Sequence, residues 1–148
     1  TTSSNAAAQE KTGSEKEMRV FIEEILRVWS PNQGQYRRVK KDTEIEGVLV
    51  PKGAILHLRY GAANFDEAVF DCPETIDLDR QKPRQHLSFG TGIHTCVGAP
   101  LARQELVTGF QMLLARFDTF ELAEDPADLK INPGYNLRGP ATLNLWCK

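Results

Sequence analysis

The sequence predicts a mainly α-helical fold with small β-sheets, an α+β class. Two long segments repeat apolar residues at helical spacing, and several short apolar runs of strand character are separated by proline and glycine. A long stretch between these segments shows neither pattern. With 148 residues, of which 41% are hydrophobic and 26% charged, the chain has the composition of one globular domain.

The first helix is expected after a short start that lacks structure-forming residues. Residues 1–17 are mostly small, polar or charged and have no apolar stripe, so we expect a flexible N-terminal segment. From Met18 onward apolar residues recur at helical spacing as far as Trp29, and Pro31 closes the segment. This pattern predicts a helix that buries one face.

Short β-strands and a long loop are expected between this helix and the next. Residues 47–50 and 55–58 are apolar runs separated by a Pro-Lys-Gly turn, which predicts a small hairpin. Residues 62–86 contain prolines and scattered hydrophobic residues, and we expect an ordered loop there. Residues 143–146 alternate apolar and polar side chains, as terminal strands do.

A second helix is predicted from about Ala99 to Phe117, with Pro100 in its first turn. Cys96 lies just before its start, where unpaired backbone N–H groups and the helix dipole favour a thiolate. Such a thiolate can act as a nucleophile or as a metal ligand. Three nearby glycines permit positive φ angles and close approach of a flat ligand to the backbone: Gly90, Gly92 and Gly98.

Several other functions are disfavoured by composition. The net charge of −2 does not provide the basic surface that nucleic-acid binding requires. No apolar run approaches the ~20 residues needed to cross a bilayer, and there is no secretion signal, so we expect a cytoplasmic protein without membrane contact. The three cysteines, Cys72, Cys96 and Cys147, are too widely spaced to suggest a disulfide framework or a zinc site.

Three alternatives to a ligand-binding role for Cys96 are considered. A free cysteine in a glycine-rich turn is usually a small buried hydrophobe. A phosphate-binding loop would need a further glycine or a Gly-Lys-Ser/Thr run after Gly90-Thr91-Gly92, and neither is present. A thiol enzyme would use His94 or His86 as its base, but a third, orienting residue is missing.

The loop as a whole resembles the haem-binding signature of cytochrome P450s. The matching pattern is Phe89-x-x-Gly92-x-His94-x-Cys96-x-Gly98, followed by Ala99-Pro100-Leu101-Ala102-Arg103. The resemblance implies haem b with Cys96 as the iron ligand and catalytic thiolate, a ligand that favours O–O cleavage. The other cofactor contacts that it implies are Arg37, Ser88, Phe89, Gly90, Ile93, His94, Gly98 and Ala102.

Further matches extend this resemblance over residues 18–148. Glu24 and Arg27, alone an ordinary helical ion pair, are similar to the buried structural Glu-x-x-Arg pair of the family. The family's third network member, an arginine, is Thr75 here. Family members are more than twice as long, so we expect the C-terminal, haem-thiolate portion of the fold, partnered by a remaining N-terminal part. Residues expected to face substrate are Gln33, Gly34, Asn136 and Leu137.

The implied function is insertion of one oxygen atom from O2 into an apolar small molecule. Residues 71–73 and 80–82 resemble the camphor-hydroxylase-like branch, which suggests a terpenoid. Electrons are expected from a ferredoxin-type partner, with a basic rim for docking formed by Arg80, Lys82, Arg84 and Arg103. The alternative is a non-catalytic haem-binding module or fragment that lacks the distal, oxygen-activating half.

Overall fold

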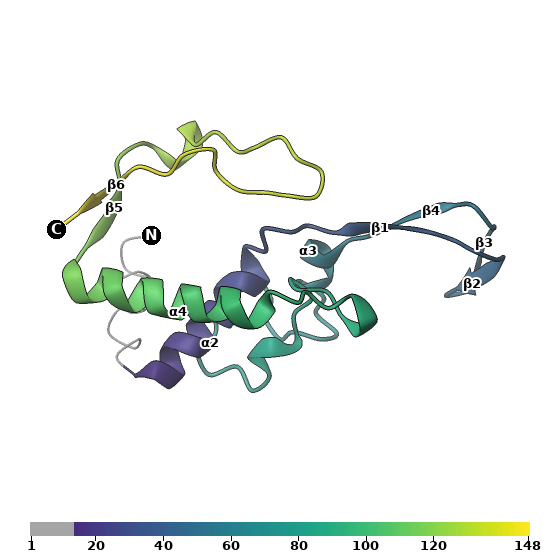
Figure 1. The fold of residues 1–148 in the computed structure, drawn as a ribbon, viewed down its shortest axis with the longest axis horizontal. Helices are drawn as coiled ribbons and strands as arrows, with labels where there is room; N and C mark the ends of the chain where they lie inside the picture. Colours follow the sequence, from purple (N-terminus) through teal and green to yellow (C-terminus); the bar gives the residue numbers. More distant parts are fainter. Residues whose placement is uncertain (1–13) are drawn as a thin grey trace.

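Two crossing helices form the centre of the structure (Figure 1). The computed structural model describes residues 14–148. Helix α2 (Glu15–Val28) begins with a capping box, in which the Ser14 hydroxyl accepts from the Glu17 amide and the Glu17 carboxylate accepts from the Ser14 amide. Residues 14–17 therefore cap and open this helix rather than forming part of a flexible segment, and residues 1–13 lie outside the described residues.

Helix α4 (Ala99–Arg116) packs across α2, and their contact contains the hydrophobic core. Phe21 of α2 and Phe110 of α4 meet edge to face, with ring centroids 5.7 Å apart. The buried members of the core are Met18, Ile22 and Leu26 of α2 and Val107 of α4. Both predicted helices are confirmed, because the periodic apolar residues of one face the periodic apolar residues of the other.

The short strands pair differently from the predicted hairpin. Strand β1 (Gln35–Arg38) pairs antiparallel with β4 (Ile55–Leu58), and β2 (Thr43–Ile45) pairs antiparallel with β3 (Val48–Val50). The predicted pairing of residues 47–50 with 55–58 is therefore wrong. Glu46 and Gly47, at φ 48° and 78°, form the two-residue turn that joins β2 to β3.

The remaining elements are short. Strands β5 (Phe120–Leu122) and β6 (Leu145–Cys147) pair antiparallel, which confirms a terminal strand near its predicted place. Helix α3 (Tyr60–Ala63) and the 3₁₀ segments η1 (Pro83–Gln85), η2 (Gly92–His94) and η3 (Pro126–Asp128) interrupt the loops. The class is thus α+β, as predicted. Within residues 14–148, no helix is both long enough and apolar enough to span a bilayer.

Candidate functional site

The loop before α4 presents Cys96 to the outside at the start of that helix. Gly90 and Gly92 have φ angles of 67° and 66°, which side-chain-bearing residues rarely adopt. The Cys96 amide donates to the Phe89 carbonyl at 2.8 Å, which closes the loop. Gly98 is the N-cap residue of α4, and the Ala99 amide donates to the Cys96 carbonyl at 3.2 Å, so the exposed thiol of Cys96 lies directly at the first turn of that helix.

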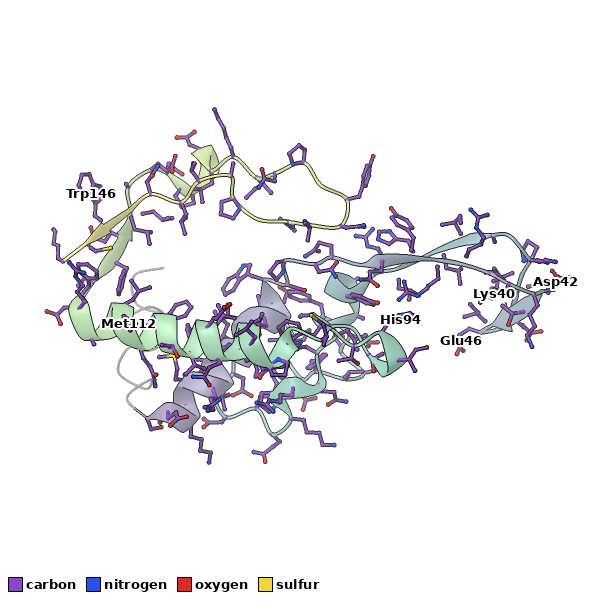
Figure 2. All side chains as sticks on the ribbon, in the orientation of Figure 1. Lys40, Asp42, Glu46, His94, Met112 and Trp146 are labelled. Carbon is purple, nitrogen blue, oxygen red and sulfur yellow. The ribbon has the colours of Figure 1, made fainter. Side chains whose placement is uncertain are left out.

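This thiol borders a cavity of about 1040 Å³ between the loop, one face of α4 and the segments around Pro31 and Leu137. Ile93 and Val97, also in its lining, are 97% and 98% exposed. Figure 2 places His94 at the end of α4 that carries the loop. The predicted cofactor contacts that line this cavity are Ser88, Phe89, Gly90, Ile93, His94, Cys96 and Ala102.

Two predicted cofactor contacts lie beside the cavity rather than among its lining residues. A β-carbon at Gly98 would lie 3.8 Å from the Cys96 sulfur, an ordinary contact distance, so Gly98 lies beside that sulfur. Arg37, on β1, donates to the Tyr36 carbonyl and to the Gln35 side chain, and Gln35 itself lines the cavity. Arg37 is therefore two residues from a lining residue, Gln35, on the same strand, and its side chain contacts that of Gln35.

The four residues expected to face substrate have different positions. Leu137 lines the cavity, and the Asn136 carbonyl accepts from the Gln33 amide at 2.6 Å. The Gln33 side chain turns back to the Ser30 carbonyl. Gly34 is buried against β4, where any side chain would collide with the Leu58 carbonyl. Of the four, Leu137 is the one in the cavity lining.

Beneath the loop, the Glu24–Arg27 pair is fully buried. The Arg27 guanidinium donates to both Glu24 carboxylate oxygens, each at 2.9 Å, and both side chains are 0% exposed. The same guanidinium donates to three backbone carbonyls, those of Asn64, Pro73 and Thr75. A buried charge of this kind is tolerated because every donor has a partner.

Arg80 completes this network. The sequence motifs did not predict this role for Arg80. Its guanidinium donates to the Glu24 carboxylate at 2.9 Å, while Thr75 contributes only its backbone carbonyl. Burial raises the pKa of Glu24, but the hydrogen bonds from Arg27, the Asp77 amide and Arg80 outweigh burial and leave that pKa below its ordinary value. The arginine is thus supplied five residues after Thr75.

A second buried polar group was missed from the sequence. Asn64, with 0% exposure, donates to the Arg27 carbonyl and to the Ser88 hydroxyl, and accepts from the Leu87 amide. The Ser88 hydroxyl donates to the Leu26 carbonyl at 2.6 Å. These bonds fix the start of the cysteine loop to the end of α2. No local sequence pattern around Asn64 signals this contact.

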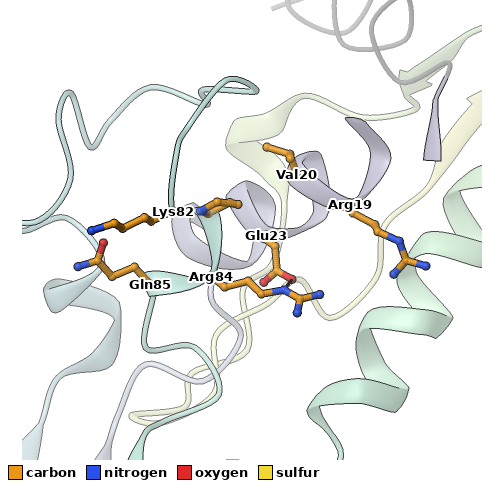
Figure 3. Close-up of a pocket in the computed structure, with 7 residues that line it drawn as sticks. Arg19, Val20, Glu23, Lys82, Arg84 and Gln85 are labelled. Carbon is orange, nitrogen blue, oxygen red and sulfur yellow. Dashed lines mark hydrogen bonds and ion pairs between the residues drawn. The ribbon is translucent and has the colours of Figure 1, made fainter. Parts of the chain in front are cut away.

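The neighbouring carboxylate, Glu23, was also missed. It is 3% exposed and accepts from Arg103, His86 and Arg84, and Figure 3 shows Arg84 reaching its carboxylate beside a smaller cavity of about 380 Å³. Burial raises the pKa of Glu23, but the hydrogen bonds from His86 and Arg103, and the charge of Arg103, lower it to about 2.

This geometry bears on two of the alternatives considered for Cys96. The residue is exposed, which contradicts the interpretation as a small buried hydrophobe. His86 is buried and both its ring nitrogens are engaged, by Glu23 and by the Ser88 amide, so it is not available as a base. Within residues 14–148, no cluster of three His, Cys, Asp or Glu side chains is arranged to hold a metal ion. Cys96 and His94 are the thiol and the imidazole that line this cavity.

Comparisons with known proteins agree with this arrangement. The profile of the cytochrome P450 family matches residues 17–143. Cytochrome P450 144 from Mycobacterium tuberculosis is 44% identical over 104 residues, which cover 70% of this chain and 24% of that protein. The polyketide biosynthesis cytochrome P450 PksS from Bacillus subtilis is 39% identical over 123 residues, 82% of this chain and 30% of that protein.

Solved structures give the same result. The chain superimposes on cytochrome P450 CYP109Q5 from Chondromyces apiculatus with a TM-score of 0.88 and 31% identity, covering 99% of this chain and 37% of that one. For PksS the TM-score is 0.82 at 37% identity, covering 87% of this chain and 33% of that one. The chain thus spans about a quarter to a third of the length of its relatives. It belongs to the cytochrome P450 family.

Proposed function

We propose that the chain is the haem-thiolate portion of a monooxygenase that inserts one atom of O2 into an apolar small molecule. The observation that carries the proposal is the exposed Cys96 thiol, placed at the open end of α4 and at the edge of a cavity of about 1040 Å³. Members of the family hold haem b through a cysteine thiolate. When bound, the haem supplies the iron at which oxygen is activated, and the thiolate ligand favours O–O cleavage.

The residues present fit a flat, largely apolar group. Ile93 and Val97 expose almost their whole side chains toward solvent, an unfavourable arrangement unless a ligand covers them. Gly90, at a φ of 67° that glycine adopts readily, and Phe89 both line the cavity. A soft thiolate is a suitable ligand for iron.

Polar groups at the rim suit the acidic substituents of haem. His94 lines the cavity and can donate a hydrogen bond from its ring. Arg37 lies on β1 next to Gln35, with its guanidinium held only by the Tyr36 carbonyl and the Gln35 side chain. We assign both residues to the haem carboxylates, since neither has a carboxylate partner among the described residues.

The substrate is proposed to be an apolar small molecule, and the terpenoid suggestion rests only on the short matches at residues 71–73 and 80–82. Relatives differ in the activities for which they are named, among them steroid C26-monooxygenase and mycinamicin IV hydroxylase/epoxidase. Leu137, in the cavity lining, is the most direct candidate for substrate contact, with Gln33, Gly34 and Asn136 shaping the same segment.

An electron donor is proposed to dock on the basic surface near the loop. Arg80 and Arg103 are engaged by Glu24 and Glu23, which reduces the charge they offer to a partner. Lys82 and Arg84 border the smaller cavity, and Arg84 is 65% exposed. An acidic ferredoxin is the partner that this charge favours. A cytoplasmic location belongs to the same proposal.

The decisive experiment is the difference spectrum of reduced, haem-loaded protein with carbon monoxide, compared between the unchanged chain, Cys96→Ser and Cys147→Ser. We expect a thiolate-type band in the unchanged chain and in Cys147→Ser, because Cys147 lies on β6 outside the cavity lining, and loss of that band in Cys96→Ser. Absence of the band from the unchanged chain would refute the proposal. Product formation with a supplied electron donor then separates a monooxygenase from a non-catalytic haem-binding module.

A further inference from the structure

The cysteine loop is held at both of its ends by one carboxylate on α2. Glu23 accepts from Arg84 at 3.1 Å and from His86 at 2.9 Å, two residues that precede the loop. It also accepts two hydrogen bonds from Arg103, at 2.7 Å and 3.0 Å, and Arg103 follows the loop on α4. The Glu23 side chain thus joins α2 to residues that lie 61, 63 and 80 positions further along the chain.

Two of these contacts, those of Arg103 and His86, continue toward the sulfur. The Arg103 guanidinium lies over the Phe89 ring, 4.6 Å from its centroid, and the Phe89 carbonyl accepts from the Cys96 amide. On the other side, the Ser88 amide donates to His86 Nδ1, so Nε2 carries the proton that His86 donates to Glu23. One path therefore runs from Glu23 through Arg103, and its contact over the Phe89 ring, to the residue that accepts from the Cys96 amide; a second, hydrogen-bonded path runs through His86 to Ser88, the residue before Phe89.

From this arrangement we infer that Glu23 is a positioning residue for the sulfur ligand, acting through Arg103 and Phe89. Its carboxylate fixes the Arg103 guanidinium over Phe89, and Phe89 in turn fixes the Cys96 amide. The carboxylate also pairs with Arg103, which is 19% exposed, and so offsets part of the positive charge that Arg84 and Arg103 bring beneath the loop. The inference rests on the proposed haem-thiolate function, but its geometric part concerns the haem-free chain.

The substitution that tests this inference is Glu23→Gln, which keeps the size of the side chain and removes its charge. Its matched control is Glu15→Gln on the same helix, which also removes a carboxylate paired with an arginine, Arg19, but has no contact with the loop. The first measurement is hydrogen exchange of the Cys96 amide relative to the α2 core amides in haem-free protein. We expect exchange about tenfold faster in Glu23→Gln and unchanged in Glu15→Gln.

The second measurement is the reduction potential of haem-loaded protein. If Glu23 had a purely structural role, its substitution would leave this potential unchanged. Removing the Glu23 charge leaves Arg103 uncompensated, and a positive charge stabilises the reduced, more negative centre. We expect a positive shift in Glu23→Gln and none in Glu15→Gln. Should Glu23→Gln fail to fold, Arg103→Lys is used instead, because it keeps the charge but loses the paired hydrogen bonds, and it should speed Cys96 amide exchange without the positive shift.

Equal exchange of the Cys96 amide in Glu23→Gln and the unchanged chain overturns the inference, as does an unshifted potential. If the chain binds no haem, the proposed function fails, but the exchange measurement still decides whether Glu23 positions the loop. The two failures are therefore distinguishable.

Discussion

The polar region beneath α2 and the cavity beside α4 place their side chains in opposite ways. Beneath α2, charged groups are buried: Glu23, Glu24 and Arg27 are 3%, 0% and 0% exposed. At the cavity, apolar side chains such as Ile93 and Val97 are almost fully exposed. The first region satisfies its polar groups within the chain, whereas the second leaves apolar side chains without contacts in the chain. The contrast separates a part of the fold that depends on its own contacts from a part where, in the proposed function, the haem would supply the missing contacts.

The largest expected effect comes from removing the centre of the buried region. Arg27→Ala should lower the free energy of unfolding by about 3–5 kcal/mol, because buried Glu24 loses two of its hydrogen bonds and three backbone carbonyls each lose one. Arg19→Ala, which breaks an exposed ion pair on the same helix, should cost no more than about 0.5 kcal/mol. Urea denaturation measures both. Similar losses in the two variants would remove the distinction between the regions.

Acid should unfold the buried region through its carboxylates. The pKa of Glu23 is about 2 instead of its ordinary 4.5, so this group stabilises the fold above about pH 4.5, and that stability is lost as the pH falls toward about 2. The loss amounts to about 3 kcal/mol. The lowered pKa of Glu24 adds to the loss in the same direction.

The measurement is the free energy of unfolding from about pH 6 down to about pH 3. Glu23→Gln should start less stable and show a flatter pH dependence, since its side chain cannot titrate. Glu15→Gln, which alters an exposed pair, should keep the slope of the unchanged chain. A full slope in Glu23→Gln would show that other groups control the acid transition.

A smaller loss is expected from the uncharged part of the same region. Asn64→Ala leaves the Leu87 amide and the Arg27 carbonyl without their partner and should cost about 1–3 kcal/mol. Asn144→Ala, an exposed position with one long hydrogen bond to Glu124, is the matched control and should change stability by less than about 0.5 kcal/mol. Thermal unfolding of both variants checks the difference, and an equally stable Asn64→Ala contradicts the role given to this side chain.

The smallest effect on stability is expected at the cavity. Ile93→Ser should change the unfolding free energy of the haem-free chain by less than about 0.5 kcal/mol, because its side chain is 97% exposed. Ile22→Ala, in the core, should cost about 2–5 kcal/mol. Haem retention should fall in Ile93→Ser. Loss of stability without loss of haem would reverse the comparison of the two regions.

The sequence predicted those features that local patterns encode. The periodic apolar residues located both long helices, and the glycine-rich motif located the loop that carries Cys96 at the cavity. The strand pairing was missed because the turn that joins β2 to β3 contains Glu46 at a positive φ. Glutamate is not a residue that predicts such a turn. Arg80 and Glu23 were missed because their partners lie 56 to 80 residues away, beyond any local pattern.

The Arg27 guanidinium has a consequence for how the chain folds. Its three backbone acceptors lie 37, 46 and 48 residues further along the chain, so no neighbour in its own helix can replace them. Helix α2 can form early from local contacts, but Arg27 stays hydrated until the segment containing Asn64 and Thr75 closes over it. Closure of that segment is therefore a late step, and substitutions of Arg27 should accelerate unfolding more than they slow refolding.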